Sequence, residues 1–285
     1  MTERLVRFQH PEKTLGYLGG VDDERLAALY NLDLGSYRVL RDGFAERARA
    51  AARDLLDDGE FAARVDKLPF EPGQRIVAIG ESTTDDLLSW FEILRHLLAL
   101  RRPADDITCV NLAVSGHTST QALTLLPAVA HHAPDWILCM LGGNDAQRLG
   151  PASGANIQHP GPAAGTGQRS GPPAGPTLVS LTETDRNLAA LRDLAAHRTG
   201  ARWVWLTPTL ADEPRVAAYP HFRRAGLTWS NEDLTAIGDL LRQRPEPTVD
   251  TQAITDPDRH LDDGLHLSLT GQSAVAATLV DTLTT

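Results

Sequence analysis

Ser82 lies where a serine can act as a nucleophile. The preceding residues Ile76 to Ile79 form a short apolar run that ends at Gly80, and apolar residues recur at helical spacing from Asp86 onward. This pattern predicts a buried strand, a tight turn that contains Ser82, and a helix. Backbone N–H groups at the start of a helix favour developing negative charge, which suits attack by a serine. The same stretch is equally consistent with a residue that merely caps the helix.

Two further turns carry groups that could stabilise an oxyanion. Gly116 follows the apolar run Ile107 to Ala113, and its N–H could approach a substrate closely because no Cβ stands in the way. Asn144 follows the run Trp136 to Leu141 and two glycines, so its amide could project from a tight turn and donate a hydrogen bond. Each of these residues is also consistent with an ordinary turn.

His266 is the candidate general base for Ser82. Asp263 lies three residues earlier and could curl back to hold the imidazole tautomer and stabilise imidazolium. A lone histidine is more often structural, and His117 and His260 are the next candidates among ten histidines. His266 is preferred because it has a close carboxylate and lies just before the last predicted helix.

Five short apolar runs predict the strands that position these groups. They have little polar alternation, as expected of strands covered on both faces, and comprise Arg75 to Ile79, Ile107 to Ala113, Trp136 to Leu141, Trp203 to Thr207 and Thr248 to Ala253. The helical segments that alternate with them are Asp86 to Leu100, Thr118 to His131, Leu181 to Arg198, Asn231 to Arg242 and Leu269 to Leu283. This α/β alternation predicts a flavodoxin-like three-layer α/β/α sandwich with a five-stranded parallel sheet in the order 2-1-3-4-5. The candidate groups would then meet at the carboxyl ends of the strands.

Two segments fall outside this alternation. Residues 1–73 show helical spacing over Asp22 to Leu32, Tyr37 to Leu56 and Phe61 to Val65, which predicts a helical N-terminal extension to a catalytic domain over residues 74–285. Residues 150–176 consist mainly of Gly, Pro, Ala and Ser, and we expect a flexible insertion there. The sequence leaves open whether this insertion is a lid and what the N-terminal helices do.

Four short stretches resemble, in order, the conserved blocks of the SGNH hydrolase superfamily, also called GDSL-type lipases and esterases. These stretches are Gly80-Glu-Ser82-Thr-Thr, Asn111 to Gly116, Gly142-Gly-Asn144-Asp145 and Asp263-Gly-Leu-His266. The resemblance covers about residues 74–285 and implies a catalytic triad of Ser82 as nucleophile, Asp263 and His266. It also implies an oxyanion hole formed by the N–H groups of Ser82 and Gly116 and by the side-chain amide of Asn144.

The chain departs from the family pattern at two positions. Glu81 stands where the first block usually has Asp, which keeps the charge but adds a methylene, and Ala113 stands where glycine is common. Neither departure removes a catalytic group. The rival α/β-hydrolase pattern Gly-x-Ser-x-Gly is not met, because its fifth position is Thr84.

These residues predict a serine esterase or deacylase that works through an acyl-enzyme. Its substrate would be a small-molecule or carbohydrate ester: a short acyl ester, an acetylated sugar or another acylated metabolite. An acyltransferase that uses the same acyl-enzyme is an alternative, and a non-catalytic binding protein is a weaker one. The chemistry needs no metal or organic cofactor, and Cys109 and Cys139 belong to no metal or redox spacing pattern.

The composition argues against some classes of partner. The 285 residues carry a net charge of −10, which disfavours non-specific attraction to nucleic acid or to anionic membranes. No segment resembles a signal peptide or approaches the ~18 apolar residues of a membrane span. We therefore expect a cytoplasmic protein without membrane insertion, whose oligomeric state the sequence leaves open.

Overall fold

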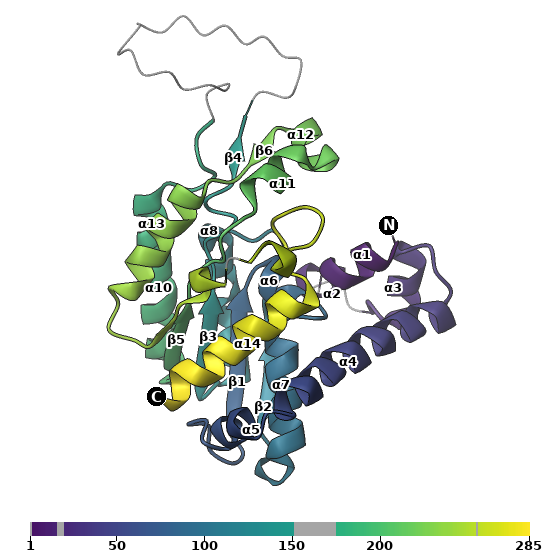
Figure 1. Ribbon diagram of the computed structural model, residues 1–285, viewed down its shortest axis with the longest axis vertical. Coiled ribbons are helices and arrows are strands. Elements are labelled where there is room, and N and C mark those ends of the chain that lie inside the picture. The colour runs from purple at the N-terminus through teal and green to yellow at the C-terminus, as the bar shows by residue number, and fades with distance from the viewer. Residues whose placement is uncertain (1, 16–19, 151–174, 255) are drawn as a thin grey trace, which may run out of the picture.

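The computed structural model describes residues 2–15, 20–150, 175–254 and 256–285 (Figure 1). The predicted insertion over residues 150–176 therefore lies almost wholly outside the described residues. The N-terminal part contains the helices α1 (Thr2–Phe8), α2 (Pro11–Thr14), α3 (Asp23–Leu29), α4 (Leu34–Leu56) and α5 (Gly59–Asp66). A central sheet with a layer of helices on each face follows them along the chain.

The central sheet has five strands that pair in parallel. They are β1 (Arg75–Gly80), β2 (Thr108–Asn111), β3 (Trp136–Met140), β5 (Arg202–Leu206) and β7 (Thr248–Val249), in the spatial order β2-β1-β3-β5-β7. Counted among the strands of this sheet alone, that order is 2-1-3-4-5. The predicted α/β class with a five-stranded parallel sheet is confirmed.

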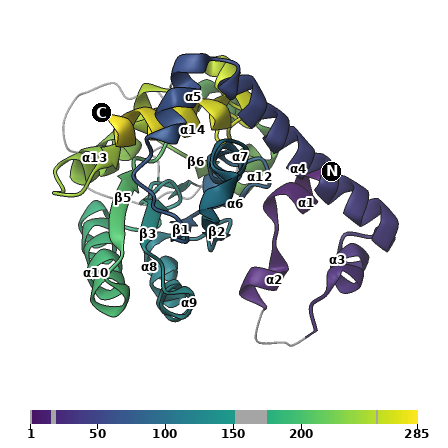
Figure 2. The same cartoon turned by 90° about the horizontal axis from the view of Figure 1, so that it is seen from below.

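Helices cover both faces of the sheet, as Figure 2 shows from below. One face carries α4, α5, α7 (Trp90–Arg101) and α14 (Leu269–Thr284), and the other carries α8 (Ser119–Ala122), α9 (Leu126–His132) and α10 (Leu181–Thr199). Successive side chains of a strand point to opposite faces of the sheet, so the core consists of two apolar clusters, one on each face. Ile76 and Ala78 of β1 pack with α4, α7 and α14, whereas Val77 and Ile79 pack with α8, α9 and α10. Burial on both faces explains why the strands lack polar alternation.

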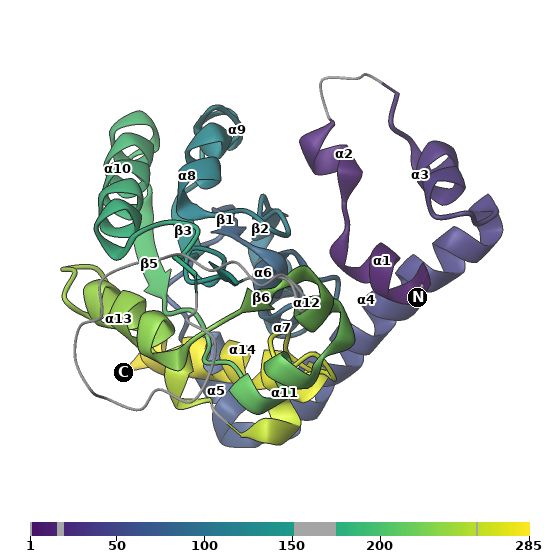
Figure 3. The same ribbon diagram turned by 90° about the horizontal axis from the view of Figure 1, so that it is seen from above.

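The N-terminal helices share the core with the sheet. Phe44, Ala48 and Ala52 of α4 belong to the same apolar cluster as Ile76 of β1. Figure 3 looks onto the carboxyl ends of the strands and shows α1 beside α4, while α11 (Glu213–Ala218) and α12 (Pro220–Ala225) lie above the sheet. The carboxyl edge is therefore flanked by the first helix of the chain and by the helices that follow β5.

Several predicted elements are shorter than expected. The helix predicted over Asp86 to Leu100 begins only at Trp90, as α7, and the separate short helix α6 (Ser82–Asp85) precedes it. Ser89 caps α7 by accepting the N–H of Glu92 at 3.3 Å. The helix predicted over Thr118 to His131 is divided into α8, the 3₁₀ turn η2 (Leu123–Leu125) and α9. The last predicted strand ends at Val249 and continues as η3 (Thr251–Ala253).

Other elements gave no clear signal in the sequence. The helices α1 and α2 are short, and the strands β4 (Arg148–Leu149) and β6 (Leu227–Thr228) form a two-residue antiparallel pair. The short 3₁₀ turns η1 (Pro103–Asp105) and η4 (Pro257–Arg259) gave none either. In contrast, the helix predicted over Asn231 to Arg242 is present with these bounds as α13 (Asn231–Arg242). Within the described part of the chain, none of the helices has the length and apolar character needed to span a bilayer.

Candidate active site

Ser82 is the first residue of α6, immediately beyond the carboxyl end of β1. The carbonyl of Glu81 accepts the N–H groups of Thr84 and Asp85 at 2.9 and 2.8 Å, which closes the first turn of α6. The side chain of Asn111, at the end of the neighbouring β2, donates to the Thr84 carbonyl at 2.7 Å. The ends of β1 and β2 thus both hold this turn in place. The N–H of Ser82 belongs to the first turn of a helix, where backbone N–H groups have no hydrogen-bond partner within the helix.

The structure brings Ser82, His266 and Asp263 into one hydrogen-bonded chain. His266 Nε2 lies 3.0 Å from Ser82 Oγ, and His266 Nδ1 lies 2.8 Å from Asp263 Oδ2. These distances are within the range for a nucleophile, a base and an orienting carboxylate. The hydrogen bond between Ser82 and His266 joins residues that are 184 positions apart in the sequence.

Asp263 is fully buried, and its carboxylate is held by several donors. Its Oδ1 accepts the N–H groups of Leu265 and His266 at 2.8 and 2.9 Å, and its Oδ2 faces the His266 ring. Burial alone would raise the pKa of Asp263, but the hydrogen bond and charge of His266 and the two backbone donors lower it well below its usual range. Asp263 therefore stays ionised at neutral pH and fixes His266 Nδ1 as the protonated nitrogen.

The candidate oxyanion donors Gly116 and Asn144 line the same pocket as Ser82. Gly116 has a φ of 85°, a conformation that side chains other than glycine rarely adopt, and open space faces the position of a Cβ. The Asn144 side chain donates from Nδ2 to the carbonyl of His117 at 3.0 Å. Because an amide nitrogen carries two hydrogens, this bond orients Asn144 and leaves its second N–H for another acceptor.

Glu81 connects the turn at Ser82 with the turn at Asn144. Its carboxylate accepts the N–H of Gly143 at 3.0 Å and that of Asn144 at 2.9 Å. A Cβ at residue 143 would lie 2.3 Å from Glu81 Oε1, so only glycine permits this approach. Trp229 donates to the Gly143 carbonyl at 2.9 Å from the opposite side. The longer side chain of Glu81 thus ties the two donor turns together.

Burial raises the pKa of Glu81 to about 8, and the nearby charge of Asp145 acts in the same direction against the two backbone donors. The folded protein then holds a proton on Glu81 that the unfolded chain, with a pKa near 4.5, releases. The free energy of unfolding contributed by this group must therefore fall as the pH rises from 4.5 to 8.

We expect Glu81→Gln to remove this pH dependence, because glutamine does not titrate. Urea unfolding of wild type and variant between pH 5 and pH 8 measures the difference, and the exposed Glu60→Gln serves as control. The wild-type free energy of unfolding should fall relative to that of Glu81→Gln across this range. Parallel curves for these two proteins would contradict the assignment.

Asp85 and Asp145 hold the loops around the site in place through hydrogen bonds. Asp85 accepts the backbone N–H and the hydroxyl of Ser115 at 2.8 and 2.9 Å, which fixes the loop that presents Gly116. The buried Asp145 accepts the Ser119 backbone N–H at 2.8 Å and the Thr184 hydroxyl at 2.9 Å. These carboxylates satisfy backbone and hydroxyl donors, and neither bonds to the side chain of Ser82.

A cavity of about 550 Å³ opens over Ser82 and His266. Sequence reasoning missed most of its wall, which is largely apolar and includes Leu5 and Phe8 of α1, Tyr219 and Phe222 of the α11–α12 segment, Leu227 of β6, and Trp229. These residues come from short elements that had no periodic signal of their own. They reach Ser82 only through the tertiary fold.

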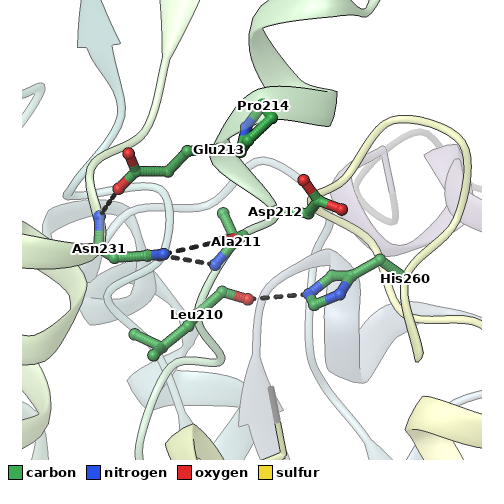
Figure 4. A pocket seen from close by; sticks show the side chains of 7 residues that line it. All are labelled: Leu210, Ala211, Asp212, Glu213, Pro214, Asn231 and His260. Carbon is green, nitrogen blue, oxygen red and sulfur yellow. Dashed lines mark hydrogen bonds between the residues drawn. The ribbon is translucent and has the colours of Figure 1, made fainter. Parts of the chain in front are cut away.

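The two other histidine candidates lie elsewhere. Figure 4 shows His260 in a separate pocket of about 410 Å³, where its Nε2 lies 2.8 Å from the Leu210 carbonyl oxygen. Asn231 in the same pocket pairs with both backbone groups of Ala211. The backbone carbonyl of His117 orients Asn144, and burial lowers the pKa of the His117 ring, with Asp85 opposing. Of the three candidates, His266 is the one that contacts Ser82.

A protein-family model, the GDSL-like Lipase/Acylhydrolase family, matches residues 78–274. The match covers more than half of the chain and contains Ser82, Gly116, Asn144, Asp263 and His266. This chain belongs to the GDSL-like lipase/acylhydrolase family. The resemblance predicted from the four sequence blocks is confirmed, and the protein is a serine hydrolase that acts on esters.

Solved structures share the fold of this acylhydrolase. LAE5, an alpha/beta hydrolase enzyme from the metagenome of Lake Arreo, Spain, is 19% identical, with 75% of this chain and 96% of that chain covered and a TM-score of 0.54. A catalytic mutant of Axe2, an acetylxylan esterase from Geobacillus stearothermophilus, is 19% identical over 75% and 95% of the two chains, with a TM-score of 0.52. The lipase/acylhydrolase from Enterococcus faecalis is 20% identical over 74% and 95%, with a TM-score of 0.50. A search among curated proteins gave no match.

Proposed function

We propose that this acylhydrolase is a serine esterase that cleaves a carboxylic ester through an acyl-enzyme on Ser82. The observation that carries the proposal is the hydrogen-bonded chain from Ser82 Oγ through His266 to the buried, ionised Asp263. Such a chain lets a hydroxyl, which is a weak nucleophile, lose its proton as it attacks. The family membership and this geometry support the same chemistry.

In the proposed mechanism, Ser82 Oγ attacks the ester carbonyl carbon while His266 Nε2 takes the hydroxyl proton. The N–H groups of Ser82 and Gly116 and the second amide hydrogen of Asn144 stabilise the tetrahedral oxyanion. His266 then gives the proton to the leaving alcohol oxygen, and the acyl group remains on Ser82. A water molecule then attacks the acyl carbon while His266 Nε2 takes its proton. As the bond from the acyl carbon to Ser82 Oγ breaks, His266 returns that proton to Oγ, the carboxylic acid is released and Ser82 is restored.

The cavity favours an ester with an apolar part over an acetylated sugar. Its wall offers aromatic and aliphatic surface from Phe8, Tyr219, Phe222, Leu227 and Trp229. Each methylene buried against such a wall is worth about 0.8 kcal/mol, or roughly a fourfold gain in kcat/KM. A sugar would bury hydroxyl groups against apolar surface, where they lose their hydrogen bonds to water.

Two ester series test this proposal on the wild-type protein. The first extends the acyl chain from p-nitrophenyl acetate to p-nitrophenyl hexanoate, and the second lengthens the alcohol from methyl acetate to hexyl acetate, so that the reactivity of the leaving group stays nearly constant within each series. We expect kcat/KM to rise by about fourfold per buried methylene in at least one series, and kcat/KM for the longer alkyl acetates to exceed that for acetylated xylooligosaccharide, whose leaving group is also an unactivated alcohol. Flat values in both series, or a preference for the acetylated sugar, would contradict the proposed substrate class.

Asn144→Ala separates a catalytic role of Asn144 from a structural one. If the amide donates to the oxyanion, kcat should fall by roughly 10²–10³ with a smaller change in KM. The melting temperature should move little, because Glu81 still holds the backbone of this turn. Measuring kcat and thermal unfolding on one preparation decides between the roles. Preserved kcat per folded molecule would remove Asn144 from the oxyanion hole.

A further inference from the structure

The first helix of the chain reaches the buried acid of the triad. Arg4 of α1 donates from Nη2 to Asp263 Oδ2 and from Nη1 to Asp262 Oδ1, the latter at 2.8 Å. Asp263 Oδ2 is the atom that also faces His266 Nδ1. The family model begins at residue 78, so Arg4 lies outside the part of the chain that it matches.

Arg4 completes the set of donors around Asp263. An ionised carboxylate has about four acceptor positions. Two are taken by backbone N–H groups, one by the His266 ring, and the fourth by the Arg4 guanidinium. The Asp263 side chain is fully buried, whereas that of Arg4 is 36% exposed. Arg4 therefore lies between the buried carboxylate and the solvent.

Other contacts hold α1 against the same site. The Phe8 ring packs on the His266 ring with centroids 4.7 Å apart and an angle of 49° between the planes. Arg7 forms a two-pronged pair with the buried Asp86 at 2.7 and 2.6 Å, and it donates to the Leu267 carbonyl at 3.2 Å. Helix α1 thus contacts the residues just before His266, the ring of His266 itself and Leu267 just after it, and these contacts set the position of Arg4.

We propose that Arg4 is a positioning residue of the triad, which holds Asp263 in place and offsets part of its charge as felt by His266. The inference rests on the triad role proposed above for Asp263 and His266. It makes α1 a working part of the catalytic site, in place of a separate N-terminal extension.

The physical consequence concerns protonation of His266. The negative charge of Asp263 stabilises imidazolium, and the positive charge of Arg4 offsets that effect. Removing the Arg4 charge stabilises imidazolium further, so His266 becomes an unprotonated base only at higher pH. The other charged or titratable groups of the neighbouring elements are Arg7, Asp86, Asp212, Arg215, Tyr219, His221 and Asp262. Of these, Asp262 and Tyr219 contact Arg4. The Asp262 carboxylate, once separated from the Arg4 charge, favours imidazolium in the same direction as Asp263.

The experiment compares Arg4→Gln, Arg4→Lys and a matched control, Arg47→Gln. Arg47 donates to Glu3 at 3.2 Å, so the control weakens the attachment of the same helix without touching the triad. We measure kcat/KM for p-nitrophenyl butyrate from pH 5 to pH 9, together with thermal unfolding. Arg4→Gln should move the midpoint of the acid limb upward by roughly half to one pH unit. Arg4→Lys and Arg47→Gln should keep it near the wild-type position.

A second readout does not depend on ester turnover. In the Ser82→Ala background, NMR follows the titration of the His266 ring with and without Arg4→Gln, and the midpoint should again rise. An unchanged midpoint in a folded Arg4→Gln protein, or an equal shift in Arg47→Gln, would overturn the inference. A different result would contradict the esterase proposal itself: in that case, Ser82→Ala would still hydrolyse the ester.

Discussion

We expect Ser82→Ala to lower kcat by roughly 10⁶-fold, the size of loss found when another serine hydrolase loses its nucleophile. The acyl-enzyme forms on the Ser82 hydroxyl, which is the group that His266 deprotonates in the proposed mechanism. A residual rate above that in water should remain, because the oxyanion donors still hold the substrate carbonyl. Steady-state hydrolysis of p-nitrophenyl butyrate by the purified variant measures the loss.

Ser115→Ala is the matched control for this experiment. Ser115 lines the same cavity, but its hydroxyl donates to Asp85 at 2.9 Å. Losing one such hydrogen bond should cost at most about tenfold in kcat, and the backbone N–H of Ser115 still bonds to Asp85. Ester turnover within tenfold of wild type by Ser82→Ala, or equal losses in the two variants, would contradict the assignment of Ser82.

Asp263→Asn should lower kcat by about 10⁴-fold, although the substitution changes little in shape. The amide oxygen is expected to stay with the N–H groups of Leu265 and His266, because both are donors. The amide NH₂ then faces His266 Nδ1, which must become the acceptor. His266 Nε2 therefore carries the proton and cannot take one from Ser82.

Asp262→Asn tests whether this loss is specific to Asp263. Asp262 is the adjacent residue, its side chain is 71% exposed, and it also pairs with Arg4. Its kcat should stay within a fewfold of wild type, because surface ion pairs contribute about 0–1 kcal/mol. If kcat for Asp263→Asn remained within tenfold of wild type at an unchanged melting temperature, Asp263 would not be the orienting acid.

Local pattern predicted the sheet and nominated the candidate groups of the site, and the resemblance to the family then singled them out from their structural alternatives. The strands of the central sheet are covered on both faces, so their apolar runs stand out in the sequence. Ser82, Gly116 and Asn144 follow three of these strands, and parallel strands bring their carboxyl ends to one edge. His266 was preferred for a local reason, its spacing from Asp263, and the structure has that contact at 2.8 Å.

The wall of the cavity could not be predicted in the same way. Helix α1 has 7 residues and α12 has 6, too few for an amphipathic period to be recognised. Arg4 and Phe8 are more than 250 residues away in the sequence from Asp263 and His266, which they contact. Only the packing of α1 against α4 and against the loop that carries Asp263 and His266 brings them together. The role of Glu81 was hidden for a similar reason, since its partners lie 62 and 63 residues away.

Reaction with a serine-directed fluorophosphonate, followed by peptide mapping, tests the central claim most directly. The probe forms a covalent bond only with an activated serine, and Ser82 lies in the tryptic peptide over residues 76–95, which also contains Ser89. Fragmentation of this peptide distinguishes the two serines. We predict a single label on Ser82 that is absent in Ser82→Ala and much slower to form in Asp263→Asn. A label on another residue, or undiminished labelling of Ser82→Ala, would contradict the proposed active site.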